Sequence, residues 1–355
     1  MSRDWCETCV GPVRDCPFNG QHPESAITVA SSQVAASMAE LDRHADTYVR
    51  WPWPSLDALY GGMAPGTLHY VVGFSGIGKS TFIASAIAKW ADAGRKVHVM
   101  PLEVRPDMFR TYMACQSLSI DPGLVMSGDY KRRPDAADIQ AKVEAALLAQ
   151  CKEPFLSRVT VHGVPDVSVG ALTQAVTHAT EQQGEILVID HVDHLEGAAK
   201  GRSLYESSVE VNRAALKLAQ RSELVIVAMS QANQGALANS QDHLAKYQPL
   251  KDNHVLNGGH KRQIAHGMLG LYRPVLDAPE GGTEADYEAW KETISLARRG
   301  EREPGTALEP MTMGVNLMKS RTYGSREGQR IALAWSNGRV VEKSVLPRSL
   351  RVVRP

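Results

Sequence analysis

The chain has 355 residues, of which 43% are hydrophobic and 22% charged, and its 39 Lys and Arg balance 39 Asp and Glu. This length allows one large or two modest globular domains, and the composition excludes collagen-like, low-complexity and wholly disordered chains. Zero net charge excludes a protein whose whole surface attracts nucleic acid, so any basic footprint must be local. No apolar run approaches the ~20 residues of a membrane span, and the start lacks the apolar core of a secretory signal, which predicts a cytoplasmic protein without a membrane partner.

The N-terminal segment, residues 1–25, differs from the rest in composition, with three cysteines, three prolines and little apolar periodicity. Five cysteines in 355 residues do not make a disulfide framework. A C-x₂-C pair followed by two further ligands suits tetrahedral Zn²⁺, although the spacing of the second pair is irregular. The sequence therefore leaves open a small zinc site or a disordered tail with incidental thiols, and the candidate ligands are Cys6, Cys9, Cys16 and His22.

Residues 26–53 are expected to form a linker. Their first part has the Ala, Ser, Val, Met and Leu pattern of a short amphipathic helix, and a W-P-W-P segment at 51–54 stops it, because each proline disfavours the α conformation of its predecessor. Trp51 and Trp53 are expected to pack against a neighbouring subunit, with stacking on nucleotides as the alternative.

From residue 54 onward, strands alternate with helices. Short apolar runs predict buried strands, and apolar residues at helical spacing predict helices that cover them. This alternation predicts the α/β class with a mainly parallel, helix-covered sheet. The expected strands are 68–72, 97–102, 159–161, 186–189 and 224–229, and the expected helices are 79–94, 134–150, 168–183 and 207–221.

After residue 272 the alternation ends. Residues 274–310 read as an insertion, and the chain then returns to strands at 315–318, 331–335 and 340–341. The last two are joined through Asn337-Gly338, and Asn-Gly between apolar runs predicts a C-terminal β-hairpin.

The segment Gly73-Phe-Ser-Gly-Ile-Gly-Lys-Ser80 matches G-x-x-x-x-G-K-[ST] between an expected strand and an expected helix. Such a loop wraps backbone N–H groups around phosphates, its lysine reaches the β- and γ-phosphates, and its serine hydroxyl binds Mg²⁺. The sequence therefore predicts a nucleoside triphosphatase that uses Mg²⁺. The residues expected at the nucleotide are Gly73, Ser75, Gly76, Gly78, Lys79, Ser80 and Thr81.

Two carboxylates end other expected strands. Asp190 follows four apolar residues, as in a Walker B strand whose aspartate orients the Mg²⁺ shell, and Asp193 is a weaker candidate that we expect to be a loop contact. Glu103 follows the strand at 97–102, and parallel strands bring their carboxyl ends to the edge that carries the phosphate loop. Glu103 is therefore a candidate for orienting the attacking water, and a solvated surface glutamate is the alternative.

Together these residues resemble the RecA-like motor domain of DnaB-type replicative helicases and of the helicase half of phage primase-helicases. The resemblance covers about residues 54–341. Its further elements, in chain order, are Ser55-Leu-Asp57, Pro101-Leu-Glu103, Asp190-His-Val-Asp-His-Leu195, Ala228-Met-Ser-Gln231 and Lys319-Ser-Arg321.

The resemblance implies a RecA-like P-loop fold and assigns roles to single residues. Glu103 would be the catalytic base, and Gln231 would sense the γ-phosphate and couple it to DNA. Lys319 and Arg321 would reach the nucleotide of the neighbouring subunit, with Arg321 as arginine finger.

Some features depart from that family. Before Leu271-Tyr-Arg273 the family has I-E-Q-D-A-D, whereas this chain has Lys261-Arg-Gln-Ile-Ala-His266. Gln263 is retained but the acidic residues are not, so the resemblance does not extend to this DNA-coupling segment. The insertion at 274–310 is longer than expected, and fifty residues before the motor domain cannot hold the helical N-terminal domain of DnaB proteins.

The resemblance also places DNA against two loops, roughly 196–204 and 233–262. Lysine and amide groups in such loops contact phosphates without reading sequence, and a merely solvated loop is the alternative. The candidate DNA contacts are Lys200 and Arg202 in the first loop and Lys246, Lys251, His260, Lys261 and Arg262 in the second.

The sequence as a whole predicts an ATP-dependent, ring-forming DNA helicase. It would assemble as a homo-oligomer, with a hexamer expected, and translocate on single-stranded DNA during replication in a bacterial or phage-infected cytoplasm, with a primase or helicase loader as partner. The alternatives are a RecA/RadA-like recombination ATPase that forms filaments on DNA and an ATP-controlled assembly or loader protein without unwinding activity.

Overall fold

The computed structural model describes residues 47–149, 158–163, 166–197, 203–233, 249–273, 312–321, 324–336 and 339–342, together with two short N-terminal strands. The chain divides into two units, Met1–Tyr48 and Val49–Pro355. In the first unit, β1 (Trp5–Cys6) pairs antiparallel with β2 (Gly11–Pro12). The helix expected after residue 25, the other three candidate zinc ligands (Cys9, Cys16 and His22) and the insertion at 274–310 lie outside the described residues.

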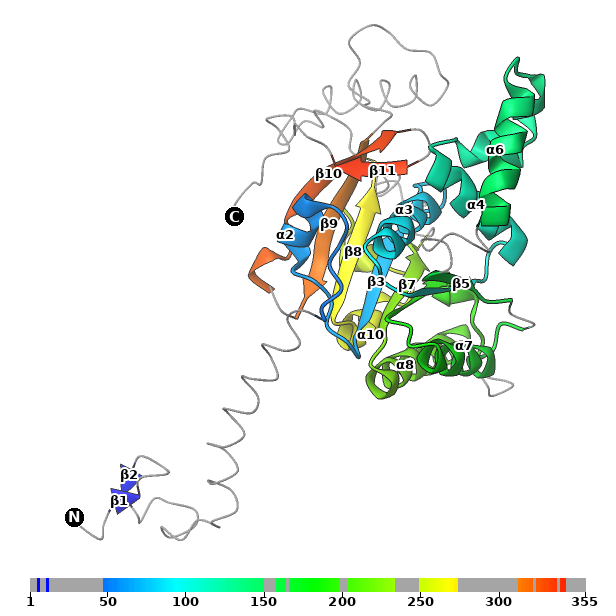
Figure 1. Ribbon diagram of the computed structural model, residues 1–355. Coiled ribbons are helices and arrows are strands. Elements are labelled where there is room, and N and C mark those ends of the chain that lie inside the picture. The colour runs from blue at the N-terminus through cyan, green and yellow to red at the C-terminus, as the bar shows by residue number, and fades with distance from the viewer. Residues whose placement is uncertain are drawn as a thin grey trace, which may run out of the picture. The chain divides into compact units, whose positions relative to one another are not determined.

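Nine of the described strands form one sheet in the second unit, in the order β11-β10-β9-β8-β3-β7-β6-β4-β5 (Figure 1). The six from β8 to β5 run parallel, and β9, β10 and β11 are antiparallel to their neighbours. This arrangement confirms the predicted α/β class and the mainly parallel sheet. The bounds are β3 Leu68–Gly73, β4 Val97–Pro101, β5 Val159–Val161, β6 Ile186–Asp190, β7 Val225–Gln231, β8 Gly267–Tyr272, β9 Thr312–Ser320, β10 Arg330–Ser336 and β11 Arg339–Glu342.

Helices cover both faces of this sheet (Figure 1). The four helices predicted between residues 79 and 221 are present, whereas α2, α4, α5, α10 and the strand β8 were not predicted. Of these, α2, α5 and α10 have only seven, five and seven residues, too few to show a helical period. The described helices include none with the length and hydropathy required to cross a membrane. The α-helices are α2 Pro54–Tyr60, α3 Lys79–Asp92, α4 Pro106–Leu118, α5 Pro122–Met126, α6 Ala136–Ala149, α7 Val169–Glu181, α8 Leu204–Ser222 and α10 Gly258–Ile264; the 3₁₀ turns are η2 Asp129–Arg132, η4 Val192–His194, η6 Asp252–His254 and η7 Gly324–Arg326.

Alternation along the central strand β3 divides the core between the two faces. Val71 packs in the apolar cluster that contains Phe82 of α3, whereas Tyr70 and Val72 pack in the cluster that contains Leu172 of α7. Successive side chains of a strand point to opposite faces, so a strand buried on both faces is apolar throughout. Both clusters hold the strand rigidly where it enters the phosphate loop.

The two tryptophans before α2 belong to the core of their own chain. Trp51 and Trp53 are 3% and 0% exposed, and the ring of Trp53 stacks 4.8 Å from that of Phe82. The Trp53 Nε1–H donates to the carbonyl oxygen of Val340 at 3.0 Å. The expectation that these side chains pack against a neighbouring subunit was therefore wrong, since α3 and the C-terminal strands of the same chain already bury them.

The predicted C-terminal hairpin is confirmed. The strands β10 and β11 pair antiparallel, with Ser336 opposite Arg339. Ser85 of α3 joins this hairpin to the core, because its Oγ accepts a hydrogen bond from the Val340 N–H at 2.9 Å. The hairpin thus lies against the helix that begins at the phosphate loop.

Candidate active site

The loop between β3 and α3 has the backbone that phosphate binding requires. Gly76 and Gly78 have φ of +72° and +96°, in the left-handed region that favours glycine. A Cβ at Gly78 would also meet the ring of Trp335, which would have to move to admit a side chain. Successive backbone N–H groups in such a turn form an anion-binding concavity. The loop is therefore preformed for phosphate.

Lys79, the first residue of α3, is 5% exposed. Its Nζ donates to the carbonyl oxygens of Gly73 and Phe74, at 2.9 and 3.1 Å. Burial lowers the pKa of Lys79, and the carboxylates of Asp190 and Glu103 oppose this shift. The ammonium group is thus held at the loop by carbonyl oxygens, close to two acids.

Asp190 ends β6 beside the first turn of α3. Its carboxylate is 2% exposed, and Oδ2 accepts a hydrogen bond from Ser80 Oγ at 3.3 Å, while Oδ1 has no hydrogen-bond partner among the described residues. Burial, with a further contribution from Glu103, raises the pKa of Asp190 to about 6. A buried, unsatisfied carboxylate oxygen beside a serine hydroxyl suits a hard cation that prefers oxygen ligands, so these residues fit Mg²⁺.

Glu103 lies next to Asp190 because of strand pairing. Pro101 of β4 is the register partner of Asp190, and the Glu103 N–H donates to the Asp190 carbonyl oxygen at 3.2 Å. The Glu103 side chain is 43% exposed, so water reaches it. One exposed and one buried carboxylate therefore share the edge of the sheet that carries the phosphate loop.

Sequence reasoning missed His191, which lies between these two acids. Its Nδ1 is 3.1 Å from Glu103 Oε2 and its Nε2 is 3.1 Å from Asp190 Oδ1, although neither pair has hydrogen-bond geometry. Burial, with a smaller contribution from Lys79, lowers the pKa of His191 to about 4, so the ring is neutral at pH 7. Its position directly after the strand-ending aspartate was the available signal.

Strands on both sides of β3 place residues opposite its last residue, Gly73. Gly73 is paired with Gln231 of β7 and with Leu271 of β8. Two residues farther along, Arg273 donates from Nη2 to the carbonyl oxygen of Gly76 in the phosphate loop, at 2.9 Å. Arg273 was noted only as part of a family triplet, and this contact makes it a further candidate for the nucleotide site.

The hydroxyl of Thr81 is hydrogen-bonded to a side chain of α4. It lies 2.5 Å from the hydroxyl of Tyr112, and Thr81 is 9% exposed. The Thr81 hydroxyl therefore has a hydrogen-bond partner within its own chain, and its expected contact with the nucleotide stays a prediction.

Lys261 corrects the expected DNA-binding loop. Residues 258–264 form α10, which packs against α8, and Lys261 is 0% exposed. Its ammonium group pairs with Asp193 and donates to Ser230 Oγ at 2.8 Å, and Asp193 Oδ2 also accepts from the Gln231 N–H at 2.7 Å. Lys261 is therefore an interior residue rather than a surface contact for DNA, and Asp193 joins α10 to the end of β7.

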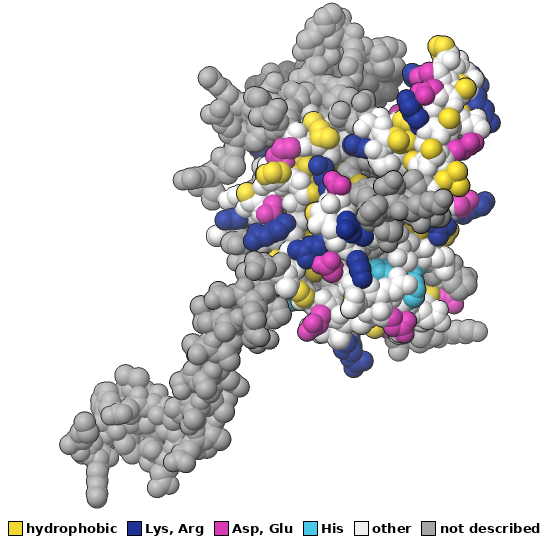
Figure 2. Space-filling model, in the orientation of Figure 1, with side chains coloured by type: hydrophobic (Ala, Val, Ile, Leu, Met, Phe, Trp, Pro, Cys, Tyr) yellow, Lys and Arg dark blue, Asp and Glu magenta, His cyan; other side chains and the backbone are white. Residues whose placement is uncertain are grey.

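The remaining candidate DNA contacts have mixed positions. His260 is 8% exposed, and Arg262 pairs with Asp252 at 2.7 Å and with Glu327 at 2.9 Å. Lys251 is exposed. On the face shown in Figure 2, Lys and Arg alternate with Asp and Glu among the described residues. The candidates Lys200, Arg202 and Lys246 lie outside the described residues.

Lys319 and Arg321 contact the C-terminal end of α10 in their own chain. Lys319 Nζ donates to the carbonyl oxygen of Arg262, and Arg321 Nη2 donates to that of Gln263 at 2.9 Å. Lys319 pairs with Met268, near the start of β8, whereas the phosphate loop lies beyond the ends of β3 and β8. A six-residue strand spans about 20 Å, so Arg321 lies far from the phosphate loop of its own chain.

Comparison with known proteins decides the family. The model of the DnaB-like helicase C-terminal domain matches residues 50–299. The chain belongs to this family. DnaB-like helicases are ATP-hydrolysing P-loop enzymes of replication, and this membership confirms the predicted enzyme class and helicase function. No curated protein matches the chain.

Two solved structures with TM-scores above 0.6 show the same fold as this DnaB-like chain. One solved ATPase domain is 17% identical, with a TM-score of 0.65 over 88% of this chain and 98% of that one. A DnaB-like replicative helicase, described with its interactions with primase, is 16% identical, with a TM-score of 0.61 over 91% of this chain and 67% of that one. The RadB recombinase is 15% identical, with a TM-score of 0.45 over 82% and 97% of the two chains.

Proposed function

We propose that this DnaB-like chain is the motor subunit of a hexameric ring that hydrolyses ATP with Mg²⁺ and translocates on single-stranded DNA during replication. The observation that carries the motor assignment is the meeting of Ser80 with the buried, half-unsatisfied carboxylate of Asp190 at the end of a preformed phosphate loop. That pair is the metal side of a P-loop site.

The side chains around that pair have separate roles in the proposed cycle. Lys79 neutralises phosphate charge, and Ser80 and Asp190 hold the metal ion. The bound Mg²⁺ would neutralise charge that develops on the phosphate oxygens. Glu103, which water reaches, accepts the proton of the attacking water, and Gln231 reports the state of the nucleotide from the end of β7.

The ring is supported by the position of Arg321. Because Arg321 lies at the opposite end of the strands from its own phosphate loop, it would complete a site only on another subunit. An arginine supplied in trans raises kcat for phosphoryl transfer by about 10³–10⁵-fold. Lys319 would act with it. The DnaB-like helicase with 16% identity was described with a primase, and we propose a primase or a helicase loader as partner here.

Mixing two inactive variants tests whether each ATP site is formed by two neighbouring subunits. Lys79→Ala and Arg321→Ala subunits should each be almost inactive alone, and mixed rings should regain part of the ATP turnover, because some interfaces then combine an intact loop with an intact arginine. Turnover is measured with and without single-stranded DNA, together with the mass of the assembly and the unwinding of a forked duplex.

The outcomes separate the alternatives. No recovery in mixtures, although both variants assemble, would refute shared sites. Filaments whose length follows the DNA would favour a recombination ATPase, and turnover that DNA does not stimulate would favour a loader without unwinding activity.

Replacement of His191 tests a positioning role. His191→Ala should lower kcat about 10–100-fold with little change in KM, because the ring lies between Glu103 and Asp190 and fixes their separation. His194→Ala is the comparison variant: it removes an exposed ring that stacks on His191, with centroids 5.9 Å apart, but leaves His191 between the two acids, so it should lose much less activity. His191→Asn should recover part of the loss. Equal kcat values for the His191→Ala and His194→Ala variants would contradict this role.

A further inference from the structure

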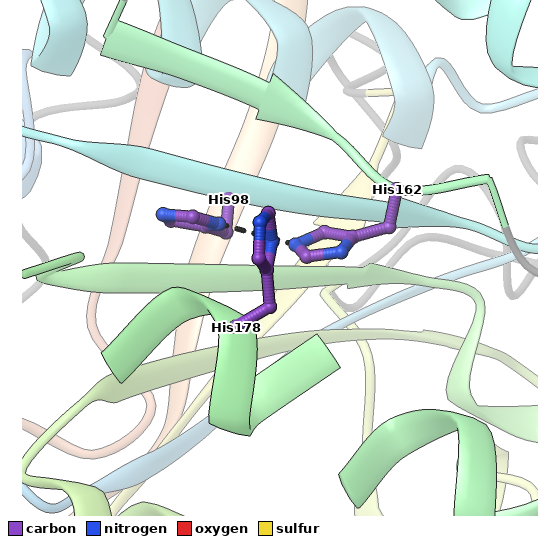
Figure 3. A group of neighbouring side chains, drawn as sticks. All are labelled: His98, His162 and His178. Atoms are coloured by element: carbon purple, nitrogen blue, oxygen red, sulfur yellow. Dashed lines mark hydrogen bonds between the residues drawn. The ribbon is translucent and has the colours of Figure 1, made fainter. Parts of the chain in front are cut away.

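Three histidines far from the nucleotide site converge at one edge of the sheet. His98 lies in β4, His162 directly follows β5, and His178 lies in α7 (Figure 3). One ring nitrogen of each lies within 4.8 Å of the others. Pairing of β4 with β5 brings the first two together, because the His162 N–H donates to the Val99 carbonyl oxygen at 2.9 Å.

The spacing of the rings suits a tetrahedral metal ion. His98 Nδ1 lies 3.1 Å from His162 Nε2. Two nitrogens bound to one tetrahedral Zn²⁺ by bonds of about 2.0–2.1 Å lie roughly 3.3 Å apart. The His98 and His162 rings would therefore move little to bind one ion. The ring of His178 stands nearly perpendicular to both, at 85° and 86°, with centroids 6.0 and 5.3 Å away.

Close packing fixes the buried member of this cluster. His98 is 2% exposed, and a Cβ on Gly184 would lie 2.9 Å from His98 Nε2. Glycine at 184 thus leaves room for the ring in the orientation that turns Nδ1 toward His162. The side-chain amide nitrogen of Gln182 lies 2.9 Å from His178 Nε2 and restrains that ring.

The charge near the cluster comes from a lysine on the segment before β4. Lys96 Nζ donates to the Gln182 carbonyl oxygen at 3.0 Å, which holds this ammonium group at the end of α7.

We propose that His98, His162 and His178 bind one Zn²⁺ ion, with water as the fourth ligand. Imidazole nitrogens are preferred ligands of zinc, and three of them with an open position form a complete protein contribution. His162 and His178 reach solvent, and histidine side chains are visible at the surface in Figure 2, so an ion and its water have access.

The role of this ion is structural. His98 lies near the start of β4, whereas β4 meets the active site at its other end, where Pro101 pairs with Asp190. The strand β5 is the outer strand of the described sheet and has three residues. A metal ion bound to β4, α7 and the residue after β5 would fasten this short edge strand to the domain.

Metal titration of the full chain tests the site. The chain is stripped with a chelator and titrated with Zn²⁺, and with Co²⁺ as a spectroscopic probe of tetrahedral geometry, in a Cys6→Ser, Cys9→Ser background that removes the other candidate site. We expect one equivalent to bind with tetrahedral Co²⁺ bands, without a thiolate charge-transfer band, and Zn²⁺ to raise the melting temperature.

Variants at the exposed side of the cluster make the result specific. His162→Ala and His178→Ala should weaken Zn²⁺ binding by at least about 100-fold and abolish the rise in melting temperature. Thr177→Ala, an exposed neighbour of His178 on α7, is the matched control and should bind like the parent. The proposal would be overturned if the parent and the His178→Ala variant bound Zn²⁺ with equal affinity, or if the parent bound no Zn²⁺ at tens of micromolar metal. His98 and His162 would then be a hydrogen-bonded pair without a metal ion.

Discussion

Lys79→Ala is expected to lower ATP turnover by about 10²–10³-fold, because it removes a preorganised charge from the phosphate loop. The ammonium group is held by the carbonyl oxygens of Gly73 and Phe74 in a site that is almost closed to solvent. Its charge is therefore weakly screened. Steady-state ATP hydrolysis and nucleotide binding, measured on the assembled protein, give the size of the loss.

The matched control is Lys89→Ala on the same helix. Lys89 is exposed in the last turn of α3, so its removal should leave turnover within about twofold of the parent, as is usual for a surface substitution away from the site. If Lys79→Ala kept more than a tenth of the parent activity while folding and assembling normally, the assigned role of this lysine would be wrong.

Lys261→Ala is expected to lower the free energy of unfolding by about 3–5 kcal/mol, because it leaves the carboxylate of Asp193 without its buried partner. The side chain of Asp193 is 12% exposed, and Ser230 loses its donor as well. The shift in the midpoint of urea unfolding measures this loss. Lys251→Ala, an exposed lysine close by in the chain, should change the midpoint little.

A double-mutant cycle separates the ion pair from simple loss of packing. The double variant Lys261→Met, Asp193→Asn should lose less free energy of unfolding than the two single variants lose in sum. The amide oxygen of the new asparagine can still accept from the Gln231 N–H, and no charge is left unpaired. Additive costs would show that the pair contributes nothing of its own. Since Asp193 also holds the backbone of Gln231, Lys261→Ala should reduce stimulation of ATP turnover by single-stranded DNA.

Much of the fold could be predicted because strong local patterns coincide with tertiary structure. Apolar runs such as Ile186–Asp190 are buried on both faces of the sheet, so their composition alone marks them as central strands. The sequence pair Asn337-Gly338 between two apolar runs likewise predicted the hairpin of β10 and β11. In contrast, α10 has seven residues with two glycines and three basic or histidine side chains, and its helical state comes from contacts distant in sequence.

The metal side of the candidate site could be predicted because its residue types and their spacing are found together mainly in phosphate-binding loops. A lysine and serine in a glycine-rich loop, with an aspartate at the end of an apolar strand, form a combination that is specific to phosphate and metal binding. Lys261 was different, because a lysine in a polar segment is usually solvated, and only the fold shows that Asp193 lies close enough to pair with it. His191 and Arg273 were missed for the same reason, since their contacts depend on which strands are neighbours.

The register of β3 with β7 and β8 constrains how this sequence can change. Gly73, Gln231 and Leu271 occupy the same register position on three adjacent strands. Loss of one residue within β7 would displace Gln231 along the sheet and turn its side chain to the other face, because side chains alternate with a period of two. Insertions in the connecting loops leave this alignment untouched. Lineages of this chain should therefore vary in loop length, as the long segment before β9 already suggests, while the lengths of these three strands stay fixed.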